Sequence, residues 1–405
     1  MNMKEARVYL DYHATTPIDN RVFNAMLPFL KEDFGNPSST FHSYGWKTRE
    51  AVNDARKTIA ASFKAQPREI IFTSGSTESN NLAIRGVTAK YRTKGNHIIT
   101  CSTEHKSVLS VCSYLENLGV NVTYLPVDRN GLLDLNKLYD AITDTTILIS
   151  LMTANNEIGV IHPMKEIGRI TKEKNIIFHT DATQAVGKMK LDVDELGIDL
   201  MSLTGHKIYG PKGIGILYVR SENPTVQLEP QITGGSQENN LRAGTLNVPG
   251  IIGLAKAIEL CDELYQEEIH STKNLRDMLL EGIRQNIDNI GVNGSLEHRI
   301  PNNLNISFRG IEAQALLMML DDIALSLGSA CLGSTIEPSH VLRALYIPEE
   351  DMYSAVRFGL GRFTSDEEIQ YVIERLTETV PMLRSQQPSR KKTKTTTAKE
   401  GNKYE

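Results

Sequence analysis

Lys207 is the residue around which a reaction centre can be built from the sequence. It follows an apolar segment, Leu200 to Leu203, and lies between Gly205 and Gly210. A lysine at the end of a buried strand is held rigidly and partly removed from water, and desolvation lowers the pKa of an amine toward neutrality. Such an amine can form a Schiff base with a carbonyl group. The alternative is a solvated loop lysine, so the neighbouring polar clusters decide the interpretation.

Two polar clusters could bind an anionic aromatic cofactor beside this lysine. Thr73 to Thr77 precedes a predicted helix, and the free N–H groups at a helix N-terminus favour a phosphate, although serine and threonine are also ordinary N-caps. Asp181 ends another apolar segment, where a buried carboxylate needs a positive partner. A protonated pyridine nitrogen is one such partner, and a helix N-cap is the other interpretation of Asp181.

His105 and Asn156 follow two more predicted strands. An imidazole can stack on an aromatic ring and move protons, and an amide can hold a ring hydroxyl, but either side chain could also complete a turn. A phosphate cradle, an acid and a lysine at the ends of neighbouring strands together predict a site for pyridoxal phosphate.

These side chains need a sheet to bring them together, and the sequence predicts one. From Glu69 onward, short apolar segments alternate with amphipathic segments. The expected strands are 70–73, 97–101, 122–125, 147–152, 176–179, 200–203 and 214–219, and the expected helices are 78–90, 107–118, 135–142 and 164–174. This order predicts a mostly parallel sheet covered on both faces, and such sheets bind ligands outside the carboxyl ends of their strands.

The composition limits the remaining possibilities. The chain has 405 residues and a formal net charge of -5, which favours two domains and gives no reason to expect direct nucleic-acid binding. We expect no membrane partner and a cytoplasmic location, because no apolar segment approaches the roughly 20 residues of a membrane span and the N-terminus lacks the layout of a signal peptide. The tail at 385–405 is rich in lysine and threonine and is predicted to be disordered.

Four cysteines are present, at positions 101, 112, 261 and 331. Their spacing gives no CxxC pair, so we expect neither a disulfide framework nor a metal site. Cys112 and Cys261 fall on apolar positions of predicted helices. Cys331 differs, because the surrounding segment SLGSACLGST consists of small residues that cannot pack as a core.

The motifs together resemble those of the cysteine desulfurases of the IscS/NifS type, from about Val8 to about Leu383. The matching segments are LDYHATTP, GNPSS, TSGSTESNN, NNEIGV, HTDATQAVGK, SLTGHKIYGPKG, LRAGTLNV, the GSAC loop with EPSHVL, and VRFGLGRFT. The resemblance implies an α/β fold of type I pyridoxal-phosphate enzymes, with a large domain built on a seven-stranded, mostly parallel sheet, a smaller α/β domain and a homodimer. We assign residues 16–253 to the large domain and residues 1–15 and 254–384 to the small one.

The same resemblance implies a reaction and assigns its residues. L-cysteine is converted to L-alanine, and the sulfur passes to Cys331 as a persulfide and then to an acceptor such as an iron–sulfur scaffold protein or a tRNA-thiolation protein. Lys207 holds the cofactor covalently, and His105 takes part in proton transfer. The cofactor-binding residues are Ser76, Thr77, His105, Asn156, Asp181, Gln184, Thr204, Gly205, His206, Lys207 and, from the other subunit, Thr245. Arg357 and Asn36 bind the substrate, and no metal is implied.

Three features depart from the family pattern. Leu327 and Leu332 flank Cys331 where small polar residues are usual, and on a mobile loop their exposure costs solubility unless the two leucines dock. The segment 237–240 lacks the arginine usual after Glu238, and the tail does not resemble the segment that docks the scaffold protein. A selenocysteine lyase, a transaminase-like enzyme and a catalytically inactive interaction protein are the alternatives, and Cys331 argues against a plain transaminase because that reaction needs no thiol.

Overall fold

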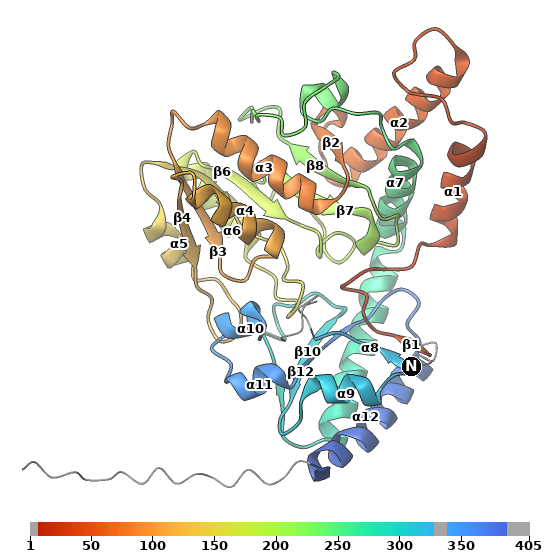
Figure 1. Ribbon diagram of the computed structural model, residues 1–405, viewed down its shortest axis with the longest axis vertical. Helices are drawn as coiled ribbons and strands as arrows, with labels where there is room; N and C mark the ends of the chain where they lie inside the picture. The colour runs from red at the N-terminus through yellow and green to blue at the C-terminus, as the bar shows by residue number, and fades with distance from the viewer. Residues whose placement is uncertain (1–6, 328–337, 387–405) are drawn as a thin grey trace, which may run out of the picture.

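The computed structural model describes residues 7–327 and 338–386 of the chain. Its large sheet has seven strands in the order β2-β8-β7-β6-β5-β3-β4 (Figure 1). Strand β8 runs antiparallel to both of its neighbours, β2 and β7, and the other six strands run in one direction. The predicted mostly parallel sheet is therefore confirmed. The strands are β2 (Ile70–Thr73), β3 (His97–Cys101), β4 (Asn121–Leu125), β5 (Thr146–Ser150), β6 (Ile177–Asp181), β7 (Leu200–Thr204) and β8 (Gly215–Val219).

Helices cover both faces of this sheet. Successive side chains of a strand point to opposite faces, and in β2 Ile70 and Phe72 enter one core while Ile71 enters the other. On the Ile71 face the residues come from α3 (Ser76–Lys90) and α4 (Lys106–Glu116). On the opposite face they come from α1 (Asn20–Lys31), α2 (Ser43–Ser62), α5 (Leu135–Ala141), α6 (Met164–Lys174) and α7 (Val248–Glu263).

A second, smaller unit is built on an antiparallel sheet in the order β12-β10-β9. The strands are β9 (Ile290–Val292), β10 (Asn303–Phe308) and β12 (Ala355–Gly359), and a separate pair joins β1 (Val8–Tyr9) to β11 (Ile323–Ala324). The helices are α8 (Tyr265–Asn286), α9 (Ala313–Met319), α10 (His340–Ala344), α11 (Glu349–Tyr353) and α12 (Asp366–Gln386). Figure 1 shows α7 and α8 running from the large sheet to the smaller unit.

The hydrophobic clusters show which segments pack with each sheet. Val8 and Leu10 bury in the core of the smaller unit, together with residues of α8, α12 and β10. The core of the large unit includes Cys261 in α7, past the predicted boundary near Gly253, and also Val341 and Leu342 of α10, whereas Leu275 of α8 belongs to the smaller core. The domain limits in sequence stay a prediction.

A buried ion cluster joins the two units. Arg362, which follows β12, donates to Asp19 at 2.7 Å and to Glu268 of α8 at 2.5 Å. Asp19 also caps α1, because its carboxylate accepts the backbone N–H of Arg21 at 2.9 Å. These hydrogen bonds from two arginines hold the pKa of Asp19 well below its usual range. The cluster therefore fixes α1 against the smaller unit.

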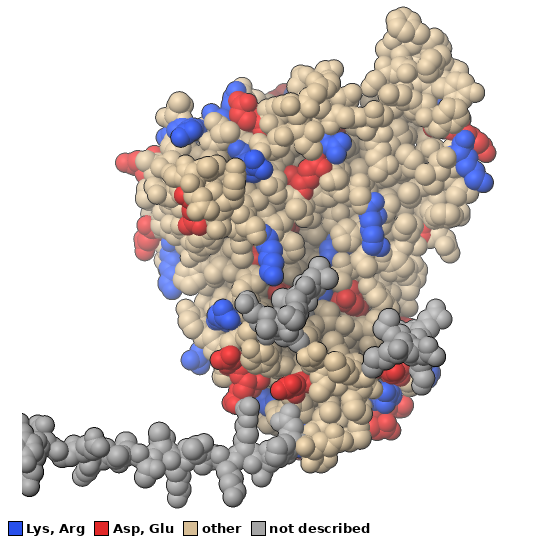
Figure 2. All heavy atoms as spheres, viewed as in Figure 1, with Lys and Arg blue, Asp and Glu red and all other residues tan. Residues whose placement is uncertain are grey.

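The surface and the C-terminal segment complete the picture. Charged side chains of both signs are scattered over the face shown in Figure 2. Within the described ranges, no helix is long and apolar enough to cross a membrane.

Ser385 and Gln386 belong to α12, so the predicted disorder is wrong for these two residues, because the helix continues to the end of the described segment. The rest of the predicted tail lies outside the described residues.

Candidate active site

The candidate site lies at the carboxyl edge of the large sheet. The strands β2, β3, β5, β6 and β7 run in one direction, so the residues that follow them meet at one edge. A cavity of about 360 Å³ opens there. Nearly all the strand-end residues singled out in the sequence line it: Ser76, Thr77, His105, Asn156, Asp181, Gln184, His206 and Lys207, with Arg357 from the smaller unit.

Lys207 ends a short 3-10 helix, Gly205–Lys207, directly after β7. Its Nζ donates to the backbone carbonyls of His13 at 2.5 Å and Ala14 at 2.6 Å. Burial, assisted by the positive charge of Arg357, lowers the pKa of Lys207 to about 8. A substantial fraction of this amine is therefore neutral and nucleophilic in mildly alkaline solution, as a Schiff-base lysine requires.

Asp181 is the last residue of β6 and is buried. One carboxylate oxygen accepts the side-chain amide of Asn80 at 2.8 Å, and the other accepts the backbone N–H of Thr183 at 3.0 Å. These donors hold a negative charge at the wall of the cavity. A buried carboxylate in this place suits a protonated ring nitrogen.

The N-terminus of α3 forms one end of the cavity. Its N-cap, Gly75, has no side chain to cap the helix, and its φ of 154° lies in a region that favours glycine. The chain is packed so closely here that a Cβ on Gly215 would lie 2.7 Å from the Cα of Gly75. Ser76 and Thr77 begin the helix and line the cavity, so their backbone N–H groups and hydroxyls suit a phosphate.

Three further residues predicted to bind the cofactor, Thr204, Gly205 and His206, lie at the end of β7 and directly after it. Thr204 is buried, and its hydroxyl donates to the carbonyl of Ile214 at 3.1 Å. Gly205 is buried at the start of the 3-10 helix. His206 lines the cavity, and its Nδ1 lies 3.2 Å from the hydroxyl of Thr15. Burial lowers the pKa of His206 to about 4, so its imidazole is neutral at physiological pH.

His13 is a site residue that the sequence reasoning did not single out. Gln184 donates from Nε2 to the carbonyl of His13 at 3.1 Å, which turns Oε1 of Gln184 toward Nδ1 of His13 at 3.0 Å. Since this amide oxygen can only accept, the His13 proton is on Nδ1. Burial lowers the pKa of His13 to about 3, and the ring lies next to the carbonyl that holds Lys207.

Arg357 enters the cavity from β12 of the smaller unit. Its guanidinium donates to the carbonyl of Asn156 at 2.9 Å and to the carboxylate of Asp11 at 2.8 Å. The side chain is buried, so its positive charge is presented in a partly desolvated site. A guanidinium in such surroundings binds a carboxylate strongly.

The structure places two predicted site residues, Asn36 and Thr245, away from this cavity. Asn36 and Thr245 are exposed on the single chain and lie outside the lining of this cavity. The side-chain oxygen of Asn36 accepts the N–H of Ser38 at 2.9 Å. Cys331 lies outside the described residues, as does Leu332. Leu327 packs partly buried against the core of the smaller unit, which is the docked arrangement of the two alternatives for this residue.

The sequence reasoning also did not predict the contacts of Glu157 and Glu238. Glu157 is buried, accepts the hydroxyl of Ser339 at 2.5 Å, and has its pKa raised by burial. Glu238, where the family pattern is incomplete, pairs with Arg56 of α2 at 2.6 Å, so its cation comes from a segment distant in sequence. The lining residues that the sequence reasoning did not assign are His13, Ala14, Lys106, Met152, Ala154, Glu157, Thr183 and His340.

Comparison with known proteins identifies the family. The aminotransferase class-V family matches residues 8–372. The chain is 49% identical over 381 residues to "Cysteine desulfurase IscS" of Anaeromyxobacter sp. (strain Fw109-5), which covers 94% of each chain. A solved structure named "NIFS-LIKE PROTEIN" matches with a TM-score of 0.87 and 36% identity over 93% of this chain and 100% of that chain. "SspA in complex with cysteine" matches with a TM-score of 0.78 and 37% identity over 88% and 100% of the two chains.

The fold and the site define a fold type I pyridoxal-phosphate enzyme, and the chain belongs to the aminotransferase class-V family. Within that family it belongs to the cysteine desulfurases, as the resemblance in sequence implied.

Proposed function

We propose that the cavity at the sheet edge performs the desulfurase reaction, with Lys207 as the residue that holds the cofactor. The observation that carries this assignment is the amine of Lys207, with a pKa of about 8, in one cavity with the carboxylate of Asp181 and the guanidinium of Arg357. Asp181 fits the ring nitrogen of pyridoxal phosphate, and the start of α3 fits the phosphate. When bound, the cofactor withdraws electrons from the α-carbon of the substrate.

The side chains of this chain then have distinct tasks. Arg357 binds the carboxylate of L-cysteine, and Asn36 assists from its exposed loop. Lys207, once displaced from the cofactor, is the base that removes the α-proton, because burial keeps its pKa close to neutrality. In this proposal Asn156 and Gln184 would contact the ring hydroxyl of the cofactor, and His105 would contact the face of its ring. Thr245 is exposed and free to reach the site of a second copy.

Cys331 completes the reaction in this proposal. Its thiolate attacks the sulfur of the substrate, the carbon–sulfur bond breaks, and a sulfur–sulfur bond forms on Cys331. The electron pair of the broken bond remains on carbon, which takes up a proton to give L-alanine. One cysteine thus yields one alanine and one persulfide, and no external oxidant is required.

The test measures alanine and protein-bound persulfide from L-cysteine in the absence of reductant. The wild-type protein should release one alanine for each persulfide formed. Cys331→Ala should bind the cofactor but form neither product, whereas Cys261→Ala, which changes a buried cysteine of α7, should form both. Persulfide formation by Cys331→Ala would reject this residue as the nucleophile. Lys207→Ala should lose the covalent attachment of the cofactor, which mass spectrometry after borohydride reduction detects.

A second copy of the chain is the partner we propose for the segment between α1 and α2. Figure 1 shows this segment projecting from the body of the molecule. Four aromatic side chains are exposed there, with Phe41 94% and Phe34 70% accessible. Tyr44 and Trp46, in the adjoining first turn of α2, are the other two. The cost of exposing such a cluster to water is removed if the partner subunit covers it.

Sedimentation of the wild type and of Phe41→Asp tests this dimer. The wild type should sediment as a dimer, and the charged variant should shift toward the monomer while keeping its circular dichroism spectrum. A wild type that remains monomeric at micromolar concentration contradicts the proposal. We also propose an iron–sulfur scaffold or tRNA-thiolation protein as the sulfur acceptor and the cytoplasm as the location, which transfer of labelled sulfur and cell fractionation test directly.

A further inference from the structure

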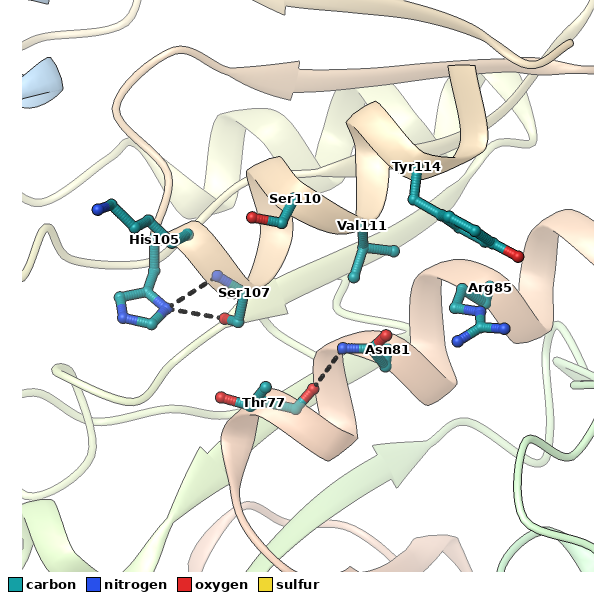
Figure 3. Close-up of a pocket in the computed structure, with 9 residues that line it drawn as sticks. Thr77, Asn81, Arg85, His105, Ser107, Ser110, Val111 and Tyr114 are labelled. Carbon is teal, nitrogen blue, oxygen red and sulfur yellow. Dashed lines mark hydrogen bonds between the residues drawn. The ribbon is translucent and has the colours of Figure 1, made fainter. Parts of the chain in front are cut away.

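His105 caps the helix that it begins, and this sets which of its nitrogens carries a proton. Its Nδ1 accepts the backbone N–H of Ser107 at 3.1 Å and lies 2.8 Å from the hydroxyl of the same residue. A backbone N–H can only donate, so Nδ1 carries no proton. Figure 3 shows both contacts on one nitrogen of the ring, with the other nitrogen on the side away from α4.

Asn80 determines which group donates in each of the hydrogen bonds that link Asp181, Ser107 and His105. Its side-chain nitrogen donates to Asp181 at 2.8 Å and to the hydroxyl of Ser107 at 2.8 Å. The reverse orientation would place the amide oxygen against the ionised carboxylate, where both groups are acceptors. Because the Ser107 hydroxyl receives a hydrogen from Asn80, its own hydrogen is available to Nδ1 of His105.

We propose that Asn80 and Ser107 are positioning residues of the desulfurase reaction, which hold His105 in the neutral form with its proton on Nε2. His105 therefore presents a hydrogen-bond donor, not a lone pair, to the bound substrate or cofactor. Taking up a second proton would require Nδ1 to lose the N–H of Ser107 and its hydroxyl to turn. The proposal rests on the assignment of His105 and Asp181 to the active site.

The protonation of His105 bears on which group takes the proton of the Cys331 thiol. A neutral histidine with its proton on Nε2 cannot accept the proton of the Cys331 thiol at that atom. Lys207, whose amine is held by two carbonyl oxygens and has its pKa lowered to about 8, is a base in the same cavity that could take this proton instead. Burial also lowers the pKa of His105, which agrees with a neutral ring.

The direct test is the tautomer of His105, measured by NMR of the cofactor-loaded protein with isotope-labelled histidine. His105→Gln assigns the signal among the 10 histidines. The expected spectrum shows a proton on Nε2 and a bare Nδ1. A proton on Nδ1 would overturn the proposal, whether or not the enzyme is active. Loss of activity in His105→Gln tests its place in the reaction separately.

Two variants test the positioning residues themselves. Ser107→Ala removes one donor to Nδ1, so kcat/KM should fall about three- to tenfold, and the pKa of His105 should rise. Asn80→Ala frees the Ser107 hydroxyl to turn and should increase the form with the proton on Nδ1. Ser107→Thr retains the hydroxyl and should restore the wild-type spectrum and rate. Unchanged spectra in both alanine variants would reject the positioning role.

Ser110→Ala is the matched control. Ser110 lies on the same helix and is exposed along the neighbouring groove, as Figure 3 shows. The variant should leave the His105 signals and the pH profile unchanged, and a change would show that any loss of a serine on α4 disturbs the ring. The charged and titratable groups that act on His105 are Asp181 of β6, Lys207 after β7, His340 of α10 and Lys106 of its own helix, and all four stay in place in these variants.

Discussion

The guanidinium of Arg357 donates to the carboxylate of Asp11 at 2.8 Å, and both side chains act on the amine of Lys207. Arg357 lowers the pKa of that amine, and Asp11 raises it. The N-terminal segment and the strand β12 of the smaller unit therefore set the reactivity of a lysine that the large sheet carries.

Capture of pyridoxal phosphate by the apoenzyme should follow the titration of Lys207. Only the neutral amine attacks the aldehyde, so the rate of covalent capture should rise about tenfold per pH unit at acidic pH and level off above a midpoint near the pKa of about 8. Stopped-flow absorbance across this range measures the rate. A midpoint near the ordinary lysine value, about 10.4, would show that burial does not act on this amine.

Asp11→Asn should move that midpoint to lower pH. The carboxylate of Asp11 favours the charged form of Lys207, and its removal leaves the opposing charge of Arg357 in place. The same capture experiment measures the shift. Asp54→Asn is the control, because Asp54 forms an exposed pair with Lys57 far from the site. A midpoint that rises in Asp11→Asn would mean that Asp11 acts mainly by holding Arg357 close to the amine.

Arg357→Lys should weaken the binding of L-cysteine. A lysine cannot form the paired hydrogen bonds of a guanidinium, so KM should rise about tenfold or more while the cofactor remains bound. Steady-state alanine release measures KM, and the visible absorption of the cofactor checks the loading. An unchanged KM would remove Arg357 as the ligand of the substrate carboxylate.

Acid should destabilise the buried ion cluster of Arg362, Asp19 and Glu268 that joins the two units. The folded-state pKa of Asp19 is depressed, so its contribution to stability is present above the ordinary aspartate pKa of about 4 and is lost as the pH falls through the folded value. Glu268 acts in the opposite sense, because burial raises its pKa. Asp19→Asn breaks a buried pair, which typically costs about 3 kcal/mol, so urea unfolding should show the loss at about pH 7 and a smaller difference from wild type at about pH 3.

Asp54→Asn serves again as the control for this experiment, because an exposed pair contributes little to stability. If Asp19→Asn and the wild type lose stability in parallel over the whole acid range, Asp19 is not the group whose protonation loosens the joint.

The sequence predicted the parts of the site that sit at the ends of strands. Lys207 and Asp181 follow apolar segments whose length and termination indicate strands, and a parallel sheet brings their ends together. Asn80 and Ser107 could not be predicted in the same way. Each lies on a helix whose periodicity explains it as an ordinary helical residue, and their contact with each other depends on how α3 packs on α4.

The sequence also did not show which distant residues pair with Glu238 and with His13. The sequence shows that the motif around Glu238 lacks its usual arginine, but not that Arg56 of α2 pairs with Glu238 instead. His13 lies in a recognisable motif, yet its contact with Gln184 joins residues that are far apart in the chain. Pairing between distant segments is fixed by packing, which leaves no periodic signal in the sequence.

The carbonyls of His13 and Ala14 that hold Lys207 belong to a short bridge of chain between the two units. Just before them, β1 pairs with β11 and Asp11 lies beside Gly359 in the smaller unit. Just after them, the N–H of Thr16 donates to the carbonyl of His206 in the large unit. Both units thus hold the segment whose carbonyls accept from the Lys207 amine, so the position of that amine depends on how the two units are joined.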